Sequence, residues 1–214
     1  MEPTLVIVLV LVLVTLMIVM VVMTGFVLHK VFHKALPILP VSLHPKSIKN
    51  ACLYDAEIYK MLCKIQQHTQ ACKIVVARFH NGGSFRNGLD MEKFSITHET
   101  QLGSTVPLQD KCINVLNSRY GSAFLHLATL GEYCISDIED CPDPNYRQDM
   151  KFYGFQASYL FMIKQFDNSD EGFLGLNFKH TTVLTQEQRE KVKNYIPRLI
   201  GLINMKESFL KETK

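Results

Sequence analysis

The stretch that decides the fold is Ala157-Ser-Tyr-Leu-Phe-Met-Ile-Lys-Gln-Phe166, then Asp167-Asn-Ser-Asp-Glu-Gly172, then Phe173-Leu-Gly-Leu-Asn-Phe-Lys179. The outer segments are rich in apolar and aromatic residues, including β-branched ones, which fit the half-buried surface of a sheet. The middle segment is polar and ends in glycine, as hairpin loops do. We therefore predict strands over 157–166 and 172–179 that pair antiparallel.

A long helix should follow this hairpin. Thr185-Gln-Glu-Gln188 has the spacing of a capping box, in which two side chains satisfy the first free backbone N–H groups of a helix. The apolar residues that share one face of this helix are Val192, Ile196, Leu199, Leu202 and Ile203. Pro197 lies inside the helix and should bend it.

The chain before the hairpin alternates between helical and strand patterns. Residues 47–70 have the three- and four-residue apolar spacing of an amphipathic helix, which Ser47 can cap. A strand over 73–80 should end in a turn at Asn81-Gly82-Gly83, and a second strand should cover 94–99. We also expect a helix over 107–119, an edge strand over 134–138 and a helix over 145–153. This order predicts an α+β fold with an antiparallel sheet of five to six strands and helices mainly on one side.

The N-terminal stretch predicts a membrane anchor. Residues 5–28 contain no charged residue, and a helix of this length spans a hydrocarbon core of about 30 Å. Residues 29–46 contain three prolines and should form a spacer before the domain at 47–214. Only Glu2 is charged on the N-terminal side, whereas four lysines precede the first acidic residue on the other side, namely Lys30, Lys34, Lys46 and Lys49. We therefore expect a single-pass protein with its N-terminus outside and its domain in the cytoplasm.

Composition argues against several classes of function. The formal net charge of +3 is too small to indicate nucleic acid as the main partner. Six cysteines lack any C-x-x-C spacing, and a cytoplasmic domain keeps its thiols reduced, so we expect small apolar residues and no disulfides. Neither a metal site nor a catalytic group is recognisable, and no cofactor is expected. The flanking of an acidic loop by Cys134 and Cys141 leaves a thiol-dependent reductase as one alternative.

Four segments carry a family resemblance: Ile135-Ser-Asp-Ile-Glu139 through Tyr146-Arg147, Lys151 to Ile163, Gly172 to Phe178, and Leu184 to Gln188. Their order is similar to that of GAF domains, the sensor and ligand-binding modules related to PAS domains, over about residues 47–206. The resemblance implies a GAF-like fold that binds a small molecule or a protein, and dimers or higher oligomers that form through the first and last helices. The chain lacks the N-K-F-D/E tetrapeptide of cyclic-nucleotide-binding members.

The candidate binding site lies at the first two predicted strands. Arg78 and His80 share one face of the first strand, and a polar set alternates along the second, namely Ser95, Thr97 and Glu99. If these faces coincide, Arg78 pairs with Glu99, and His80, Asn81 and the amides of Gly82 and Gly83 line a concavity that receives an anion or carboxylate. The alternative is a plain turn beside a cross-strand ion pair of small net value.

An aromatic set over 152–162, which includes Tyr159, is a second candidate wall for a ligand, and its alternative is ordinary core. From these features we expect a membrane-anchored, non-catalytic domain that binds a small ligand or a protein partner. The second interpretation is a structural or assembly component at the membrane, such as one from a phage or another mobile element.

Overall fold

A computed structural model describes Met17 and residues 48–80, 92–103, 105–164 and 170–212. Apart from Met17, these residues belong to one compact unit, Pro45–Lys214. The predicted anchor at 5–28 and the spacer at 29–46 therefore fall outside the described residues, Met17 excepted. Among the residues that are described, no helix is both long enough and apolar enough to cross a bilayer.

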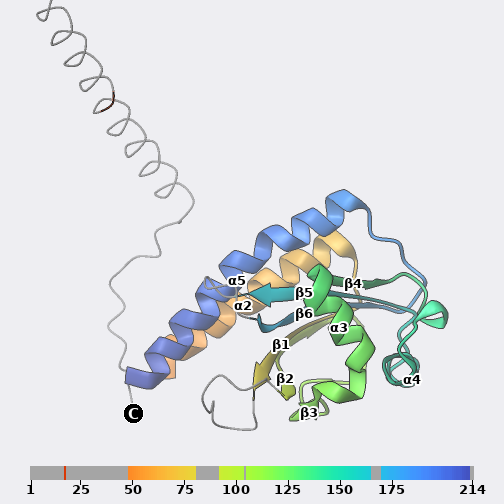
Figure 1. Cartoon of the computed structure of the whole chain (residues 1–214). Helices are drawn as coiled ribbons and strands as arrows, with labels where there is room; N and C mark the ends of the chain where they lie inside the picture. Colours follow the sequence, from red (N-terminus) through yellow and green to blue (C-terminus); the bar gives the residue numbers. More distant parts are fainter. Residues whose placement is uncertain (1–16, 18–47, 81–91, 104, 165–169, 213–214) are drawn as a thin grey trace, which may run out of the picture. The chain divides into compact units, whose positions relative to one another are not determined.

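Six strands form one sheet in the described part of the chain (Figure 1). They are β1 (Lys73–His80), β2 (Lys93–Gln101), β3 (Val115–Leu116), β4 (Glu132–Ile135), β5 (Ala157–Lys164) and β6 (Asp170–Phe178). Their order is β3-β2-β1-β6-β5-β4, and every neighbouring pair is antiparallel. The antiparallel sheet and the β5–β6 hairpin are therefore confirmed.

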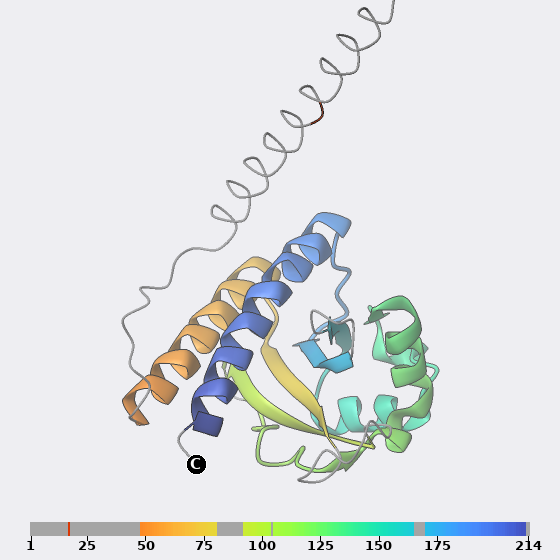
Figure 2. The same ribbon diagram turned by 60° about the vertical axis from the view of Figure 1, so that its left-hand side comes forward.

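Helices cover both faces of this sheet, which corrects the prediction of helices mainly on one side. Figure 2 shows α2 (Ile48–Thr69) and α5 (Gln186–Glu212) side by side on one face, with α3 (Gly121–Leu130) and α4 (Pro144–Phe152) across the sheet. Successive side chains of a strand point to opposite faces, so β1 supplies both cores. Ile74 and Val76 pack with α2 and α5, whereas Val75, Ala77 and Phe79 pack with α3 and α4.

The capping box at the start of α5 is confirmed. The N–H of Gln188 donates to Thr185 Oγ1 over 3.2 Å, and the N–H of Thr185 donates to Gln188 Oε1 over 3.0 Å. The helix continues through Pro197 to Glu212. Four of its five predicted face residues are buried in the core, and Ile196 packs against them.

The helix predicted over 107–119 is wrong. This segment consists of turns, the short strand β3 and the beginning of a 3₁₀ helix, η1 (Asn117–Tyr120), and the helix comes later as α3. Asn114 adopts a positive φ of 56°, which stops a right-handed helix. Side chains of β2 also accept backbone N–H groups of this segment: Glu99 accepts those of Leu108 and Gln109, and Ser95 accepts that of Asn114.

Candidate functional site

A β-bulge in β2 rearranges the predicted polar face. Val76 lies opposite His98 and Ala77 lies opposite Ile96, so Thr97 is an extra residue between them. Beyond the bulge the alternation is shifted by one residue: Glu99 lies opposite Val75, on the α3/α4 face, whereas Ser95 lies opposite Arg78, on the α2/α5 face. The prediction that Ser95, Thr97 and Glu99 share a face is therefore wrong.

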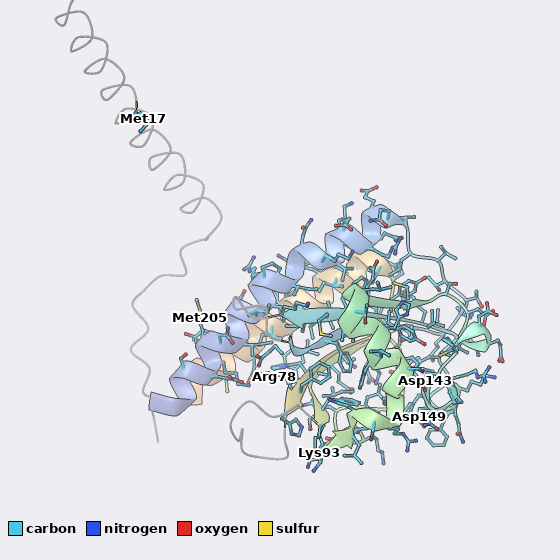
Figure 3. All side chains as sticks on the ribbon, in the orientation of Figure 1. Met17, Arg78, Lys93, Asp143, Asp149 and Met205 are labelled. Carbon is cyan, nitrogen blue, oxygen red and sulfur yellow. The ribbon has the colours of Figure 1, made fainter. Side chains whose placement is uncertain are left out.

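Arg78 contacts two carboxylates, and neither is the predicted Glu99. Its guanidinium forms ion pairs with Glu171 of β6 and Glu207 of α5, and Figure 3 shows Arg78 beside α5. Gly172 lies opposite Arg78 in the adjoining strand, and a Cβ there would collide with the carbonyl oxygen of Ala77. Burial lowers the pKa of Arg78. Its Nε is buried without a hydrogen-bond partner among the described residues.

A second charged group lies on the same face of the sheet. His98 is 6% exposed, and its Nε2 is 2.9 Å from Asp55 Oδ1 of α2. Lys206 of α5 donates to the same carboxylate oxygen over 2.6 Å. Burial lowers the pKa of His98, opposed by its hydrogen bond to Asp55. We call the full set the interhelix network: Asp55, Arg78, His98, Glu171, Lys206 and Glu207.

His80 and Ser95, two of the candidate site residues, lie next to each other near the end of β1. His80 Nε2 is 2.8 Å from Ser95 Oγ, which also accepts the N–H of Asn114 over 2.9 Å. Burial and the nearby charge of Lys93 lower the pKa of His80. Asn81, Gly82 and Gly83 lie outside the described residues, so the concavity that they were expected to line stays a prediction.

Glu99 and Thr97 have structural partners on β1 and in the loop after β2. Glu99 Oε2 accepts the N–H groups of Leu108 and Gln109 over 2.7 and 2.9 Å. Lys73, which is fully buried, lies 3.6 Å from the same oxygen and also donates to the carbonyl of Val106. Burial lowers the pKa of Lys73, and Glu99 opposes this shift. The Thr97 hydroxyl donates to the carbonyl of Val76 over 3.2 Å.

Tyr159 lies in the α2/α5 core and is 3% exposed. Its hydroxyl donates to the carbonyl of Thr182 over 2.7 Å and accepts the N–H of Leu184 over 3.1 Å. These bonds fix the connection between β6 and α5. The described hydrogen bonds of Tyr159 involve neither Arg78 nor His80, and its role as a second candidate wall for a ligand stays a prediction.

The space between the sheet and the α3/α4 layer contains a cavity of about 40 Å³. Aromatic rings fill most of this layer, and Phe94, Phe124 and Phe173 have centroids 5.4–5.5 Å apart. Three polar side chains in this layer are linked by hydrogen bonds. The Tyr146 hydroxyl is 2.6 Å from Ser158 Oγ, which donates to Asn177 Oδ1 over 2.8 Å. The sequence did not predict these hydrogen bonds, because they join residues of three separate elements, α4, β5 and β6.

The two cysteines considered for a reductase lie on opposite faces of the sheet. Cys134 packs against the α2/α5 core, whereas Cys141 is buried in the α3/α4 core. Burial raises the pKa of the Cys134 thiol, which disfavours the thiolate that such chemistry needs. Within the described ranges, no group of three or more His, Cys, Asp and Glu residues is placed to hold a metal ion.

Several solved structures with a similar architecture are GAF domains. The chain superposes on GAF3 of a Synechocystis protein in its photoproduct state with a TM-score of 0.57 and 10% identity, covering 74% of this chain and 97% of that one. The PixJ GAF domain of Thermosynechococcus elongatus, in its blue-light-absorbing form, gives 0.58 and 8%, covering 78% and 94%. A GAF domain/HD domain protein of Geobacter sulfurreducens gives 0.56 and 9%, covering 76% and 99%.

No family model and no curated protein matches the sequence. The structural likeness, at 8–10% identity, concerns the fold alone. The described domain therefore has the α+β fold of GAF domains, as the resemblance of its carboxyl half predicted.

Proposed function

We propose that this chain is a non-catalytic sensor module, held at a membrane by residues 5–28, in which ligand binding at the domain changes the packing of α2 and α5. The observation that carries the proposal is the position of Arg78. A single guanidinium contacts Glu171 in the sheet and Glu207 on α5. A shift of β1 against β6 would therefore act directly on the last helix.

The rest of the interhelix network extends this connection to α2. Asp55 of α2 binds both His98 of β2 and Lys206 of α5. In the sequence, α2 follows the predicted spacer, so its movement is the natural route by which a domain would act on an anchor. The cyanobacterial relatives in fold include light-absorbing GAF domains, which supports a sensory role by analogy of fold.

The proposal is tested on the full chain in lipid nanodiscs. Small molecules extracted from the purified protein are identified by mass spectrometry and added back, and hydrogen exchange is followed in α2 and α5. We expect a stoichiometric ligand that changes exchange in both helices. Arg78→Gln should abolish that change, whereas Arg198→Gln should keep it, because the pair that Arg198 forms with Glu57 is exposed and 3.9 Å long. A purified chain without a ligand, or a ligand that leaves both helices unchanged, contradicts the proposal.

An assembly role at the membrane is the second candidate, and one observation favours it. Three large apolar side chains on the α2/α5 pair are 38–43% exposed, namely Leu53, Tyr59 and Met205. Such residues would suit a contact between copies of the chain. Mass photometry of the full chain in detergent should then show dimers or larger species. Leu53→Lys with Met205→Lys should convert them to monomers, and unchanged oligomers would exclude this surface.

A further inference from the structure

We propose that a groove at the free edge of β5 binds a long-chain carboxylate, that is, a fatty acid. This inference gives the proposed sensor a ligand class and therefore rests on that function. The groove has a volume of about 510 Å³, which lies within the range of small-molecule sites. The cavity beneath α3 and α4 offers only about 40 Å³.

The groove exists because β5 is longer than its neighbour. β4 begins at Glu132, which pairs with Phe161, and Gly131 still accepts the N–H of Met162. β5 continues to Lys164, beyond the first residue of β4, and residues of α5 line the same edge. A ligand at this edge would therefore touch both the sheet and the helix that carries Glu207.

The floor of the groove is apolar. Phe161 of β5 and Ile196 and Ile200 of α5 line it from the α2/α5 side of the sheet. Met162 lines it from the α3/α4 side, and Leu130, at the end of α3, is 63% exposed. Pro197 also lines the groove and has no N–H, so it cannot donate to the carbonyl of Lys193 one turn earlier. An aliphatic chain that lies against these residues is removed from water, which is favourable.

Two lysines give the groove its charge. Lys164 and Lys193 both line it, one from each wall. Lys193 Nζ is 3.3 Å from Glu132 and 3.2 Å from Glu190, whose side chain is 51% exposed. A surface pair of this kind is easily exchanged, so a ligand carboxylate can replace Glu190 at Lys193. An apolar floor with cations at its rim fits one alkyl chain that ends in an anion.

The probe is palmitate that carries a photoactivatable diazirine on its alkyl chain. The full chain is labelled in phosphatidylcholine nanodiscs, and the labelled peptides are mapped by mass spectrometry. We expect labels near Met162 and Ile196 that excess palmitate removes and that an equal concentration of hexadecyltrimethylammonium leaves in place. Labels confined to residues 5–28, or equal competition by both compounds, overturn the proposal.

Charge-reversal variants provide the matched comparison. Lys193→Glu should reduce labelling of the groove at least tenfold, and Lys164→Glu should reduce it several-fold. Lys191→Glu changes a neighbouring lysine that pairs with Glu187 outside the groove, and it should label as the original chain does. Hydrogen exchange of the sheet, measured on each variant, verifies folding. Equal labelling in folded Lys193→Glu and Lys191→Glu proteins contradicts the proposal.

Failure of the groove and failure of the sensor are distinguishable. If palmitate labels the groove without changing hydrogen exchange in α2 and α5, the fatty-acid site is supported and the sensor function is contradicted. If another extracted molecule changes hydrogen exchange in both helices while the groove stays unlabelled, the sensor function is supported and the fatty-acid site is contradicted.

Discussion

Arg78 in the middle of the sheet contacts Glu207 on the last helix, and the same guanidinium contacts Glu171 of the adjoining strand. The side chains of Arg78 and Glu171 are 17% and 8% exposed. Removing the cation leaves a nearly buried carboxylate without this partner, and breaking such a pair costs about 3–5 kcal/mol. We expect Arg78→Gln to lower the free energy of unfolding of residues 45–214 by about 3 kcal/mol in urea titrations.

Arg198→Gln is the control for this measurement, because its pair with Glu57 is long and exposed. Its effect should stay below about 1 kcal/mol. Equal effects of the two substitutions would show that the Arg78 pairs contribute no more than surface charge.

The stability of the domain should fall as the pH drops below neutrality. Burial lowers the pKa values of His98 and His80 below their ordinary value of 6.5. The unfolded chain therefore takes up protons first, so the loss of stability begins near pH 6.5 and continues to the folded pKa values. We expect a lower melting temperature at pH 5.5 than at pH 7.5 by circular dichroism.

Substitutions of single histidines test whether His98 causes this pH dependence of stability. His98→Gln should reduce the difference between the two pH values, whereas His180→Gln should keep it, because His180 is exposed. An equal pH dependence in the original domain and in His98→Gln would exclude His98 as a source.

Glu99 should hold the loop at 105–112 against the sheet. Glu99→Ala removes the acceptor of two backbone N–H groups and leaves Lys73 buried without its counter-charge. We expect a loss of about 3–5 kcal/mol and much faster amide exchange at Leu108 and Gln109. Glu99→Gln keeps an acceptor oxygen, so its amides should exchange more slowly than those of Glu99→Ala. Unchanged exchange in Glu99→Ala would refute this role.

The aromatic layer under α3 should open when one ring is removed. Phe173 is 5% exposed and lies within 6 Å of Phe79, Phe94 and Phe124, measured between ring centroids. Phe173→Ala should destabilise the domain by about 3–5 kcal/mol and leave an apolar cavity. Added benzene should then raise the melting temperature of the variant and leave the original domain unchanged. No selective effect of benzene would mean that the layer collapses into the space.

Periodic patterns predicted the long elements of this fold. The apolar spacing of α2 and α5, and the composition of the β5–β6 hairpin, indicated elements whose boundaries the structure changes by only a few residues. The helix predicted over 107–119 failed because Glu99 of β2 accepts the N–H groups of Leu108 and Gln109, and because Asn114 adopts a positive φ. A carboxylate that arrives from a neighbouring strand leaves no local periodic signal.

The candidate site was predicted less well, and one residue explains why. Face assignments assumed strict alternation along β2, but the bulge at Thr97 places Ser95 and Glu99 on opposite faces. The pairing of Arg78 with Glu207 could not be predicted either, since it depends on the position of a helix at the other end of the chain. The contact between His80 and Ser95 was not predicted, because it too depends on the register of β2 against β1.

The strand order also affects how the chain is made. β1 pairs with β2 beside it in the sequence and with β6 about a hundred residues later. During synthesis, one edge of β1 therefore stays open until β6 has emerged from the ribosome. Closing such a distant pair is slow, because a long loop loses entropy before any contact compensates. The apolar face of α2 stays exposed until α5 has been synthesised, so newly made chains should depend on chaperones up to that point.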